Sequence, residues 1–332
     1  MKPPTPSSTA NSPVQGALRP DCPQCFALCC TAFGFARSAD FAIDKPPATP
    51  CPNLAADFSC TIHDRLRPRG FPGCTVFDCF GAGQAVSQRL LGGISWRDNP
   101  DPAAGMFTAF KVLRQLHEML WLLGQAAARA YGPDTAGDAR SLAAAVRRVA
   151  DSGLEDLLAA DVESLHRQVG ETLRLVSEEV RAGYFSAAYG DAGSSSLHPR
   201  IHLEPGADLA GADLAGADLR GLVLCGADLR GACLIGADVR GADLTATDLL
   251  GADLRDARLD GADLAGALFL TPPQVGAARG SGSTRLPEGL ARPGHWAASV
   301  PEDAPTGPRK RLDRRIVSAD SGGNRPQAKA TR

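Results

Sequence analysis

The most regular hydrophobic pattern in the chain is a five-residue repeat that runs from Gly206 to Leu270 in thirteen consecutive copies. The central position is Leu in eleven copies, with Val239 and Phe269 in the other two, and Ala precedes it by two residues in eleven copies. Because a period of five fits neither the helical period of 3.6 nor the strand period of 2, the chain must turn a corner every five residues. Ala and Leu then share an inner face, Asp points outward, and Gly occupies the corner in eleven copies.

This block resembles the pentapeptide-repeat family, whose pattern A-(D/N)-L-x-x it follows. The resemblance implies a right-handed, quadrilateral β-helix with four repeats per coil, and thirteen repeats make a little over three coils. Stacking every twenty residues creates outward columns. One column holds Arg220, Arg240 and Asp260, and another holds Asp208, Asp228 and Asp248.

Upstream of the repeats the pattern changes to a helical period. Apolar residues at i, i+3, i+4 and i+7 predict helices over 103–130, 137–151 and 162–182. Ser152 with Glu155 predicts a capping box for a short helix between the last two, and Asp161 predicts the cap of the third. Together these helices predict a small helical bundle. A coiled-coil dimer is less favoured, because the apolar stripe lacks sustained heptads.

These patterns predict a multidomain chain. Residues 1–20 and the basic tail 299–332 are rich in Pro and polar residues and are expected to be disordered. Residues 186–205 form a linker in which His198 and His202 are loop residues, and residues 271–298 cap the repeats. The full set of segments is 1–20, 21–100 (cysteine-rich module), 101–185 (helical region), 186–205, 206–270 (β-helix), 271–298 (cap, with Val275 and Leu286 over the last coil and Trp296 nearby) and 299–332.

The low net charge of the chain disfavours a partner that is bound mainly by electrostatic attraction. The net charge is −2, although the repeat block has eleven Asp against five Arg and residues 301–332 have eight basic against four acidic side chains. The basic stretch 309–315 lacks aromatic residues, so a solvated tail is favoured over nucleic-acid binding. Neither a signal peptide nor a run of eighteen apolar residues is visible, so the expectation is a cytoplasmic protein without a membrane span.

The candidate chemistry lies in the cysteines. In a secreted chain such a cluster would indicate disulfides, whereas cytosolic thiols stay reduced and a dense cluster favours metal. Thiolates suit zinc or an iron-sulfur cluster, and the sequence does not choose between them, nor between two single-metal sites and one cluster. Eight of the ten cysteines fall within one stretch, namely Cys22, Cys25, Cys29, Cys30, Cys51, Cys60, Cys74 and Cys79.

Residues 22–80 resemble a family of cysteine-cluster domains described as zinc- or iron-chelating, which implies metal binding by these cysteines. The opening departs from the family pattern in having three residues before the Cys29-Cys30 pair, and the Arg67-Pro68 dipeptide lies farther from Cys74 than is usual. His63 is a further possible donor but is more simply a surface histidine. Cys225 and Cys233 lie in the repeats and are interpreted as tolerated substitutions, and the Gly81–Gln84 stretch is interpreted as a loop. The matching residues are Cys22, Cys25, Cys29, Cys30, Cys51, Pro52, Leu54, Cys60, Ile62, His63, Arg67, Pro68, Cys74, Phe77 and Cys79.

Three functions remain in competition. The first is a non-enzymatic interaction scaffold in which a repeat tower carries a metal-binding cysteine module and meets an unidentified protein partner. The second is a redox or metal-handling component that the tower docks. The third is a DNA mimic that binds a topoisomerase, which is less favoured because arginines interrupt the acidic surface. No catalytic motif is visible, so enzyme activity is not predicted, and oligomeric state is left open.

Overall fold

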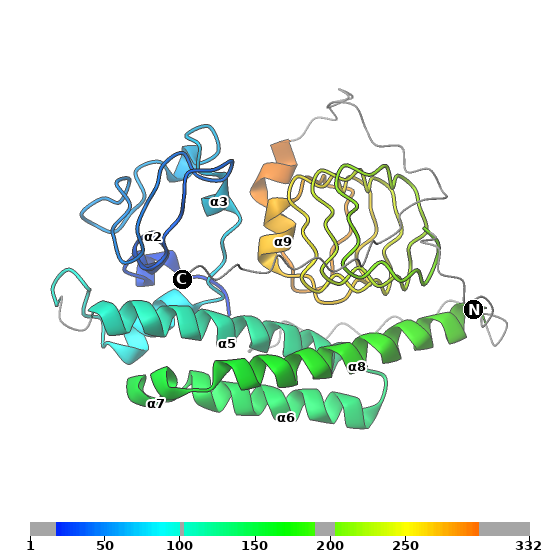
Figure 1. Ribbon diagram of the computed structural model, residues 1–332, viewed down its shortest axis with the longest axis horizontal. Coiled ribbons are helices and arrows are strands. Elements are labelled where there is room, and N and C mark those ends of the chain that lie inside the picture. The colour runs from blue at the N-terminus through cyan, green and yellow to red at the C-terminus, as the bar shows by residue number, and fades with distance from the viewer. Residues whose placement is uncertain (1–17, 100–102, 190–202, 299–332) are drawn as a thin grey trace, which may run out of the picture.

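The computed structural model describes residues 18–99, 103–189 and 203–298. Two predictions concern residues outside these ranges: disorder for 1–17 and 299–332, and a loop for His198 and His202. The described chain has three parts: a cysteine lobe (18–99), a helical layer (103–189) and a tower (203–298). Figure 1 shows the lobe and the tower side by side on the helical layer.

The helical layer contains the predicted helices. They are α5 (Ala103–Arg129), α6 (Pro133–Ala150), α7 (Leu154–Ala159) and α8 (Val162–Tyr189). Asp161 caps α8 as expected, because its Oδ1 accepts a hydrogen bond from the Ser164 backbone N–H at 2.9 Å. Residues 186–189 continue α8, so the linker begins later than predicted.

The capping box predicted at Ser152 is wrong. Helix α7 starts after Gly153, without a side-chain cap. The Ser152 hydroxyl instead donates to the carbonyl oxygen of Val149 at 2.8 Å. That carbonyl lies in the last turn of α6, where backbone acceptors lack helical partners, so the serine serves the end of one helix instead of the start of the next.

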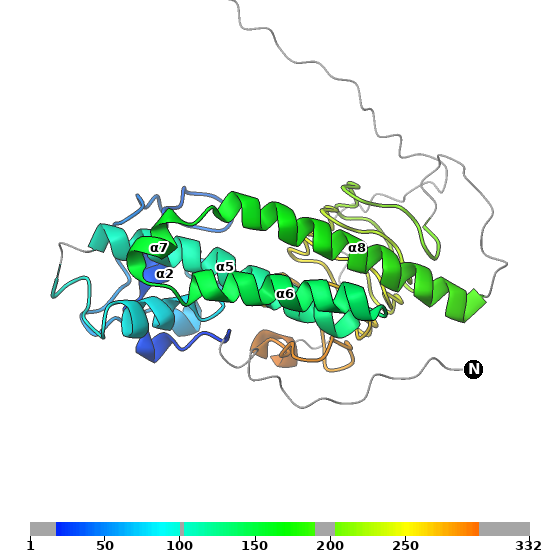
Figure 2. The same ribbon diagram turned by 90° about the horizontal axis from the view of Figure 1, so that it is seen from below.

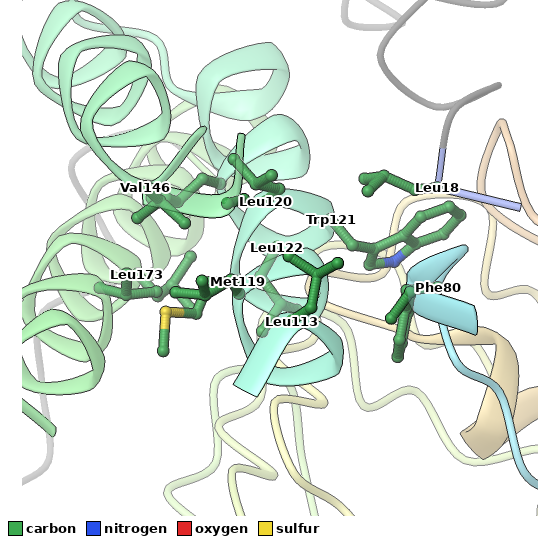
Figure 3. Close-up of a cluster of buried hydrophobic side chains, with 14 of the residues drawn as sticks. Leu18, Phe80, Leu113, Met119, Leu120, Trp121, Leu122, Val146 and Leu173 are labelled. Carbon is green, nitrogen blue, oxygen red and sulfur yellow. The ribbon is translucent and has the colours of Figure 1, made fainter. Parts of the chain in front are cut away.

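Helix α5 forms the centre of the main core. Its apolar residues contact α6 and α8 on one side, while Trp121 lies on the side of Phe80 and Leu18 (Figure 3). Leu18 is 3% exposed, so the disorder predicted for residues 1–20 does not hold from Leu18 onward. Burying a leucine side chain contributes roughly 1.5–3 kcal/mol, enough to fix this short segment.

The tower is the predicted repeat structure. Parallel pairing joins Asp208 to Asp228 and Asp228 to Asp248, a register of twenty residues. The Asp228 N–H donates to the Ala207 carbonyl oxygen and the Leu209 N–H to the Asp228 carbonyl oxygen, both at 2.8 Å, so consecutive coils are bonded through their backbones. The inner Ala and Leu residues form one continuous core.

Corner positions explain the repeated glycine. Gly211 has φ 66°, in the left-handed region that a Cβ disfavours. Where the repeat lacks glycine, Ala246 and Asp256 adopt the same conformation, each with φ 56°. The register therefore persists through positions where the local residue is strained.

The C-terminal cap closes the tower as predicted. Helix α9 (Pro272–Ala277) follows the last repeat, and Arg279 and Arg285 then pair with Arg258 and Asp263 of the coil before. Val275 and Trp296 are each 1% exposed, and Leu286 packs against the same core. The Trp296 indole N–H donates to the Ala278 carbonyl oxygen at 3.0 Å, which holds the final turn over the coil.

One face of the tower is packed against α8, which runs along it (Figure 2). Arg181 of α8 donates to the Gly226 carbonyl oxygen at 2.8 Å and to Asp228 Oδ2 at 3.1 Å. Asp228 and Asp248 are 3% and 0% exposed. The column of Asp208, Asp228 and Asp248 keeps the predicted register, but it is not a free acidic face, because α8 buries two of its members.

The cysteine lobe also reaches the tower. Arg255 Nη1 lies 3.6 Å from Asp40 Oδ2, and a Cβ added at Gly276 of α9 would lie 3.7 Å from the Thr75 carbonyl oxygen. The lobe is therefore held from two directions, by the helical layer and by the end of the tower. None of the helices in the described residues has the length and apolar character needed to cross a bilayer.

Candidate metal centre

The cysteine lobe is built mostly from turns. Its helical segments are η1 (Cys22–Gln24), α2 (Leu28–Ala32), η2 (His63–Arg65), α3 (Pro72–Thr75), α4 (Ala82–Gln84) and η3 (Ala85–Leu90). Its own apolar core is centred on only three buried residues, Ile62, Leu66 and Phe71. Other apolar residues of the lobe, among them Leu28, Phe80 and Val86, belong to the main core around α5. The outer loops have only the small core, so cross-links by disulfides or metal would stabilise them most.

All ten cysteines are free thiols. The eight in the lobe come from separate elements that the fold brings into one region. Cys22, Cys29 and Cys74 are exposed, and the other five are half-buried. Their positions are the start of η1 (Cys22), the residue after η1 (Cys25), α2 (Cys29 and Cys30), a loop (Cys51), a short antiparallel pairing with Leu54 (Cys60), α3 (Cys74) and the segment before α4 (Cys79).

Gly83 supports two of the sulfurs. A Cβ at this position would lie 2.6 Å from Cys25 Sγ, so glycine leaves the room that this sulfur occupies, and 3.8 Å from Cys79 Sγ, an ordinary contact distance. Gly83 belongs to α4, and the loop predicted for Gly81–Gln84 is wrong for residues 82–84. A helical turn here, directly after Cys79, places the backbone against the sulfur atoms.

Hydrogen-bond donors point at the same sulfurs. Burial raises the pKa of the Cys79 thiol, and the N–H groups of Gly83 and Gly81 oppose this by donating to the sulfur. Burial likewise raises the pKa of Cys25 to about 11, against donation from the Leu28 N–H and the Ser87 hydroxyl. Donors of this kind stabilise thiolate over thiol, as in the outer shell of metal-thiolate sites.

Lys45 places a cation beside other cysteines. Its ammonium donates to three carbonyl oxygens, among them Thr31 at 3.2 Å and Thr49 at 2.7 Å, and the residue is 4% exposed. Burial lowers the pKa of Lys45, while the charges of Cys51, Cys30 and Cys29 raise it. A buried lysine held in this way favours nearby thiolates.

Cys29 and Cys30 touch each other. Their sulfur atoms are 3.9 Å apart on α2, close enough for one thiol to donate to the other. This hydrogen bond raises the pKa of Cys29 and lowers that of Cys30. The turn that two adjacent cysteines need in order to present both sulfurs is thus supplied by a helix.

The donor set fits zinc or an iron-sulfur cluster by its chemistry, because thiolates are the ligands that both prefer. As placed, no three His, Cys, Asp or Glu side chains within residues 18–99, 103–189 and 203–298 form a group able to hold a metal ion. Ligation would therefore require the sulfurs to draw together. His63 is exposed on η2, and metal binding by any of these residues stays a prediction.

The two tower cysteines lie apart from the lobe in the sequence. Cys233 occupies an Asp position, paired with Asp213 and Asp253, as predicted. Cys225 lies at a variable position of its repeat, which the five-residue pattern predicts to face outward, but it is 1% exposed. It lies beside the corner that Gly206 and Gly226 form against Phe185 of α8, and this packing covers it.

Sequence reasoning missed Gly83, Lys45 and Ser87 as supports of the cysteine cluster. For Gly83 and Ser87 the contacts join residues about sixty positions apart, such as the Phe26 N–H donating to Ser87 Oγ at 3.3 Å. Lys45 lies nearer to its cysteines in the sequence, but no local motif links them. The only local signal was two glycines shortly after Cys79, in a stretch that a turn would explain equally well.

Comparison with known proteins gives matches to the repeat block and to most of the chain. Residues 207–245 and 240–269 match the sequence model of pentapeptide repeats, in eight copies. The chain is also 47% identical over 290 residues to YybG of Bacillus subtilis strain 168, a protein described as uncharacterized. That alignment covers 87% of this chain and 98% of the relative, so it extends well beyond the repeat block.

Solved structures of pentapeptide-repeat proteins match part of the chain. Rfr23 from the cyanobacterium Cyanothece 51142 is 34% identical over 24% of this chain and 53% of its own, with a TM-score of 0.22. HetL from Nostoc sp. strain PCC 7120, involved in heterocyst differentiation regulation, is 33% identical over 23% of this chain and 42% of its own, with a TM-score of 0.12. The chain thus spans about half or less of these two proteins.

Proposed function

Since the chain belongs to the pentapeptide-repeat family and is a homologue of the uncharacterized Bacillus subtilis protein, we propose that it is a non-enzymatic scaffold that carries a metal-binding cysteine module. The observation that supports this best is that eight free thiols lie in one lobe, whose outer loops have only a small apolar core of their own, and that Cys25 and Cys79 both border Gly83. Such a lobe gains the cross-links it lacks when thiolates share a metal. A cytoplasmic location, where thiols stay reduced, is part of this proposal.

The tower serves as a rigid support in this proposal. Four of the eleven aspartates in the repeat block pair with the arginine two residues later; Arg220 and Arg255, for example, lie 2.7 Å from Asp218 and Asp253. Such internal pairs offset part of the acidic charge of the block, which favours docking by shape over attraction of a highly charged partner. We propose a protein partner for the tower faces that α8 does not cover.

The same pairs weigh against a DNA mimic. A DNA-mimicking surface needs a continuous run of unpaired negative charge, whereas the column containing Asp228 and Asp248 is buried under α8. Supercoiling by DNA gyrase should therefore proceed unchanged in the presence of this protein. Inhibition at a low protein concentration would restore the topoisomerase hypothesis.

Metal analysis and an absorption spectrum of the full chain, purified without oxygen, test the proposal. A colourless protein with stoichiometric zinc supports a structural site in a scaffold. A brown protein with iron and visible absorption supports the alternative, a redox or metal-handling component that the tower docks. A chain without bound metal that remains fully folded would contradict both. Cys233→Ser, outside the lobe, is the matched control and should leave the metal content unchanged.

A further inference from the structure

We propose that the eight thiols form two separate four-thiolate sites that meet at α2. This inference rests on the proposed metal binding and assigns its ligands. The helix-side site lies against the helical layer, and the loop-side site lies in the outer loops of the lobe. The helix-side site comprises Cys22, Cys25, Cys29 and Cys79, and the loop-side site comprises Cys30, Cys51, Cys60 and Cys74.

The helix-side group is assembled around Gly83. Its sulfurs from Cys25 and Cys79 both border the space that a Cβ on Gly83 would fill. Cys22 and Cys25 are joined by a single turn, in which the Cys25 N–H donates to the Cys22 carbonyl oxygen at 3.1 Å. Two sulfurs on one tight turn and a third on a neighbouring segment make the usual framework of a four-thiolate site.

The loop-side group is linked by backbone bonds among its own members. The Cys51 N–H donates to the Cys30 carbonyl oxygen at 3.0 Å, and the Leu54 N–H to the Cys51 carbonyl oxygen at 3.0 Å. Leu54 in turn pairs with Cys60. These contacts bring Cys30, Cys51 and Cys60 together without involving the helix-side turn.

The two groups also belong to different apolar cores. Cys25 and Cys79 pack against the main core, which is centred on α5. Cys60 packs against the small core of Ile62, Leu66 and Phe71. A metal in each group would fasten a different core, so neither site could substitute for the other.

The surroundings of the remaining two cysteines assign them. The Cys74 N–H donates to the Phe71 carbonyl oxygen at 3.1 Å, and Phe71 belongs to the small core that Cys60 also contacts. The Leu28 N–H donates to the Cys25 sulfur, which places that sulfur at the start of α2, directly before Cys29. Cys74 is therefore assigned to the loop-side group and Cys29 to the helix-side group.

Helix α2 explains why adjacent cysteines serve different sites. Successive side chains on an α-helix are rotated by about 100°, so Cys29 and Cys30 face different neighbours. Their sulfurs nevertheless stand 3.9 Å apart, so the two sites adjoin. Lys45 approaches Cys30 and Cys51, so its charge acts mainly on the loop-side site.

Cobalt binding to the full chain tests the division, because Co²⁺ accepts the same tetrahedral thiolate sites as zinc and reports them by its absorption. The metal-free chain is titrated with Co²⁺ under reducing conditions. Two double variants each remove one site: Cys25→Ser with Cys79→Ser, and Cys60→Ser with Cys74→Ser. We expect about two equivalents of Co²⁺ for the unaltered chain and for Cys233→Ser, and about one for each double variant.

The outcomes separate the two proposals. An unaltered chain that binds no Co²⁺ would overturn the metal-binding function itself. One equivalent in the unaltered chain, or loss of all Co²⁺ binding in a folded double variant, would overturn the division and leave the function standing. A circular dichroism spectrum identifies variants that have not folded.

A second measurement avoids substitutions altogether. The unaltered zinc-loaded chain is treated with rising amounts of chelator, and exposed thiols are alkylated and mapped by mass spectrometry. We expect the four helix-side cysteines to become reactive together and the four loop-side cysteines together at another chelator concentration. Reactivity groups that mix the two sets would overturn the division.

Discussion

Trp121, in α5, donates its indole N–H to the backbone carbonyl oxygen of Leu270 at 3.0 Å, although 149 residues separate the two. Leu270 is the last residue of the repeat block, so this bond fastens the tower to the helical layer. Gln125, one turn along α5, donates to the same oxygen at 2.8 Å. The carbonyl therefore has two donors from one helix.

Loss of both donors should cost more than the sum of the single losses. Trp121→Phe or Gln125→Met alone leaves the carbonyl one partner, and each is expected to lower the free energy of unfolding by roughly 1 kcal/mol. The double variant leaves a buried acceptor without a partner, which adds about 1–3 kcal/mol. Chemical denaturation of the four proteins measures the coupling. Strictly additive effects would mean that the oxygen is reached by water.

Asp228 and Asp248, stacked in one column of the tower, should respond in opposite directions to replacement by Asn. Burial raises the pKa of Asp248, with partial opposition from Ser177, and its Oδ2 has no hydrogen-bond partner. The pKa of Asp228 is lowered because hydrogen bonds from Arg230 and the charges of Arg181 and Arg230 outweigh burial. Asp248→Asn should therefore stabilise the fold at pH 7 by roughly 1 kcal/mol, and Asp228→Asn should destabilise it by at least as much.

The pH dependence of unfolding tests the cause assigned to the Asp248→Asn effect. A raised pKa in the folded state stabilises the protein below the unfolded value of 3.8 and loses that contribution as pH rises through the folded pKa. The gain from Asp248→Asn should consequently be present at neutral pH and disappear near pH 3. Thermal unfolding at both pH values measures it. A gain that is equal at both pH values would contradict the cause assigned here.

His117 should make the fold sensitive to acid. Burial lowers its pKa from 6.5 to about 4, with smaller contributions from Arg147 and Arg89. Its Nδ1 lies 2.7 Å from the Phe80 carbonyl oxygen, which can only accept, so the neutral ring donates from Nδ1.

The unfolded chain therefore binds a proton between pH 6.5 and 4 that the folded chain does not. Stability should be constant above this window and fall as pH drops through it, by at most about 3 kcal/mol. His117→Gln keeps a donor for Phe80 but cannot titrate, so its unfolding free energy should lack this component. Parallel pH profiles for the two proteins would show that His117 is protonated as easily in the fold as outside it.

Gly83→Ala should weaken metal binding without unfolding the tower. The added methyl group would approach Cys25 Sγ to 2.6 Å, so this sulfur must leave its present position. We expect a loss of roughly tenfold or more in zinc affinity, as for disturbed outer-shell contacts. Competition with a chromogenic chelator measures the affinity. Gly105→Ala in α5 is the control, because a Cβ there meets only Leu154 Cδ2 at 4.0 Å.

Local periodicity predicted the tower and the helices well, because both depend on repeated short-range patterns. The period of five places each Leu inside whatever its neighbours are, and Asp161 caps α8 through a contact three residues away. The boundary errors at Ser152 and Leu18 are of another kind. Ser152 bonds to the end of the preceding helix, and Leu18 packs against the main core, so neither contact is contained in the residue's own predicted segment.

The site was predicted less completely, because its geometry is set by distant contacts. Cysteine spacing identified the eight thiols, but it did not place Lys45 beside Cys30 or Gly83 beneath Cys25 and Cys79. In the tower, Asp248 occupies the same repeat position as the exposed Asp208. It is buried because α8, some seventy residues earlier, lies across that face.

The central claim, that the cysteine lobe binds metal through its thiolates, is tested most directly by native mass spectrometry of the full chain purified without oxygen. The expected result is a native mass that exceeds the sequence mass by bound zinc or by iron and sulfide, with the excess lost on acidification, when thiolates take up protons. A folded chain whose native mass equals the sequence mass, with all eight lobe thiols free, would contradict the claim.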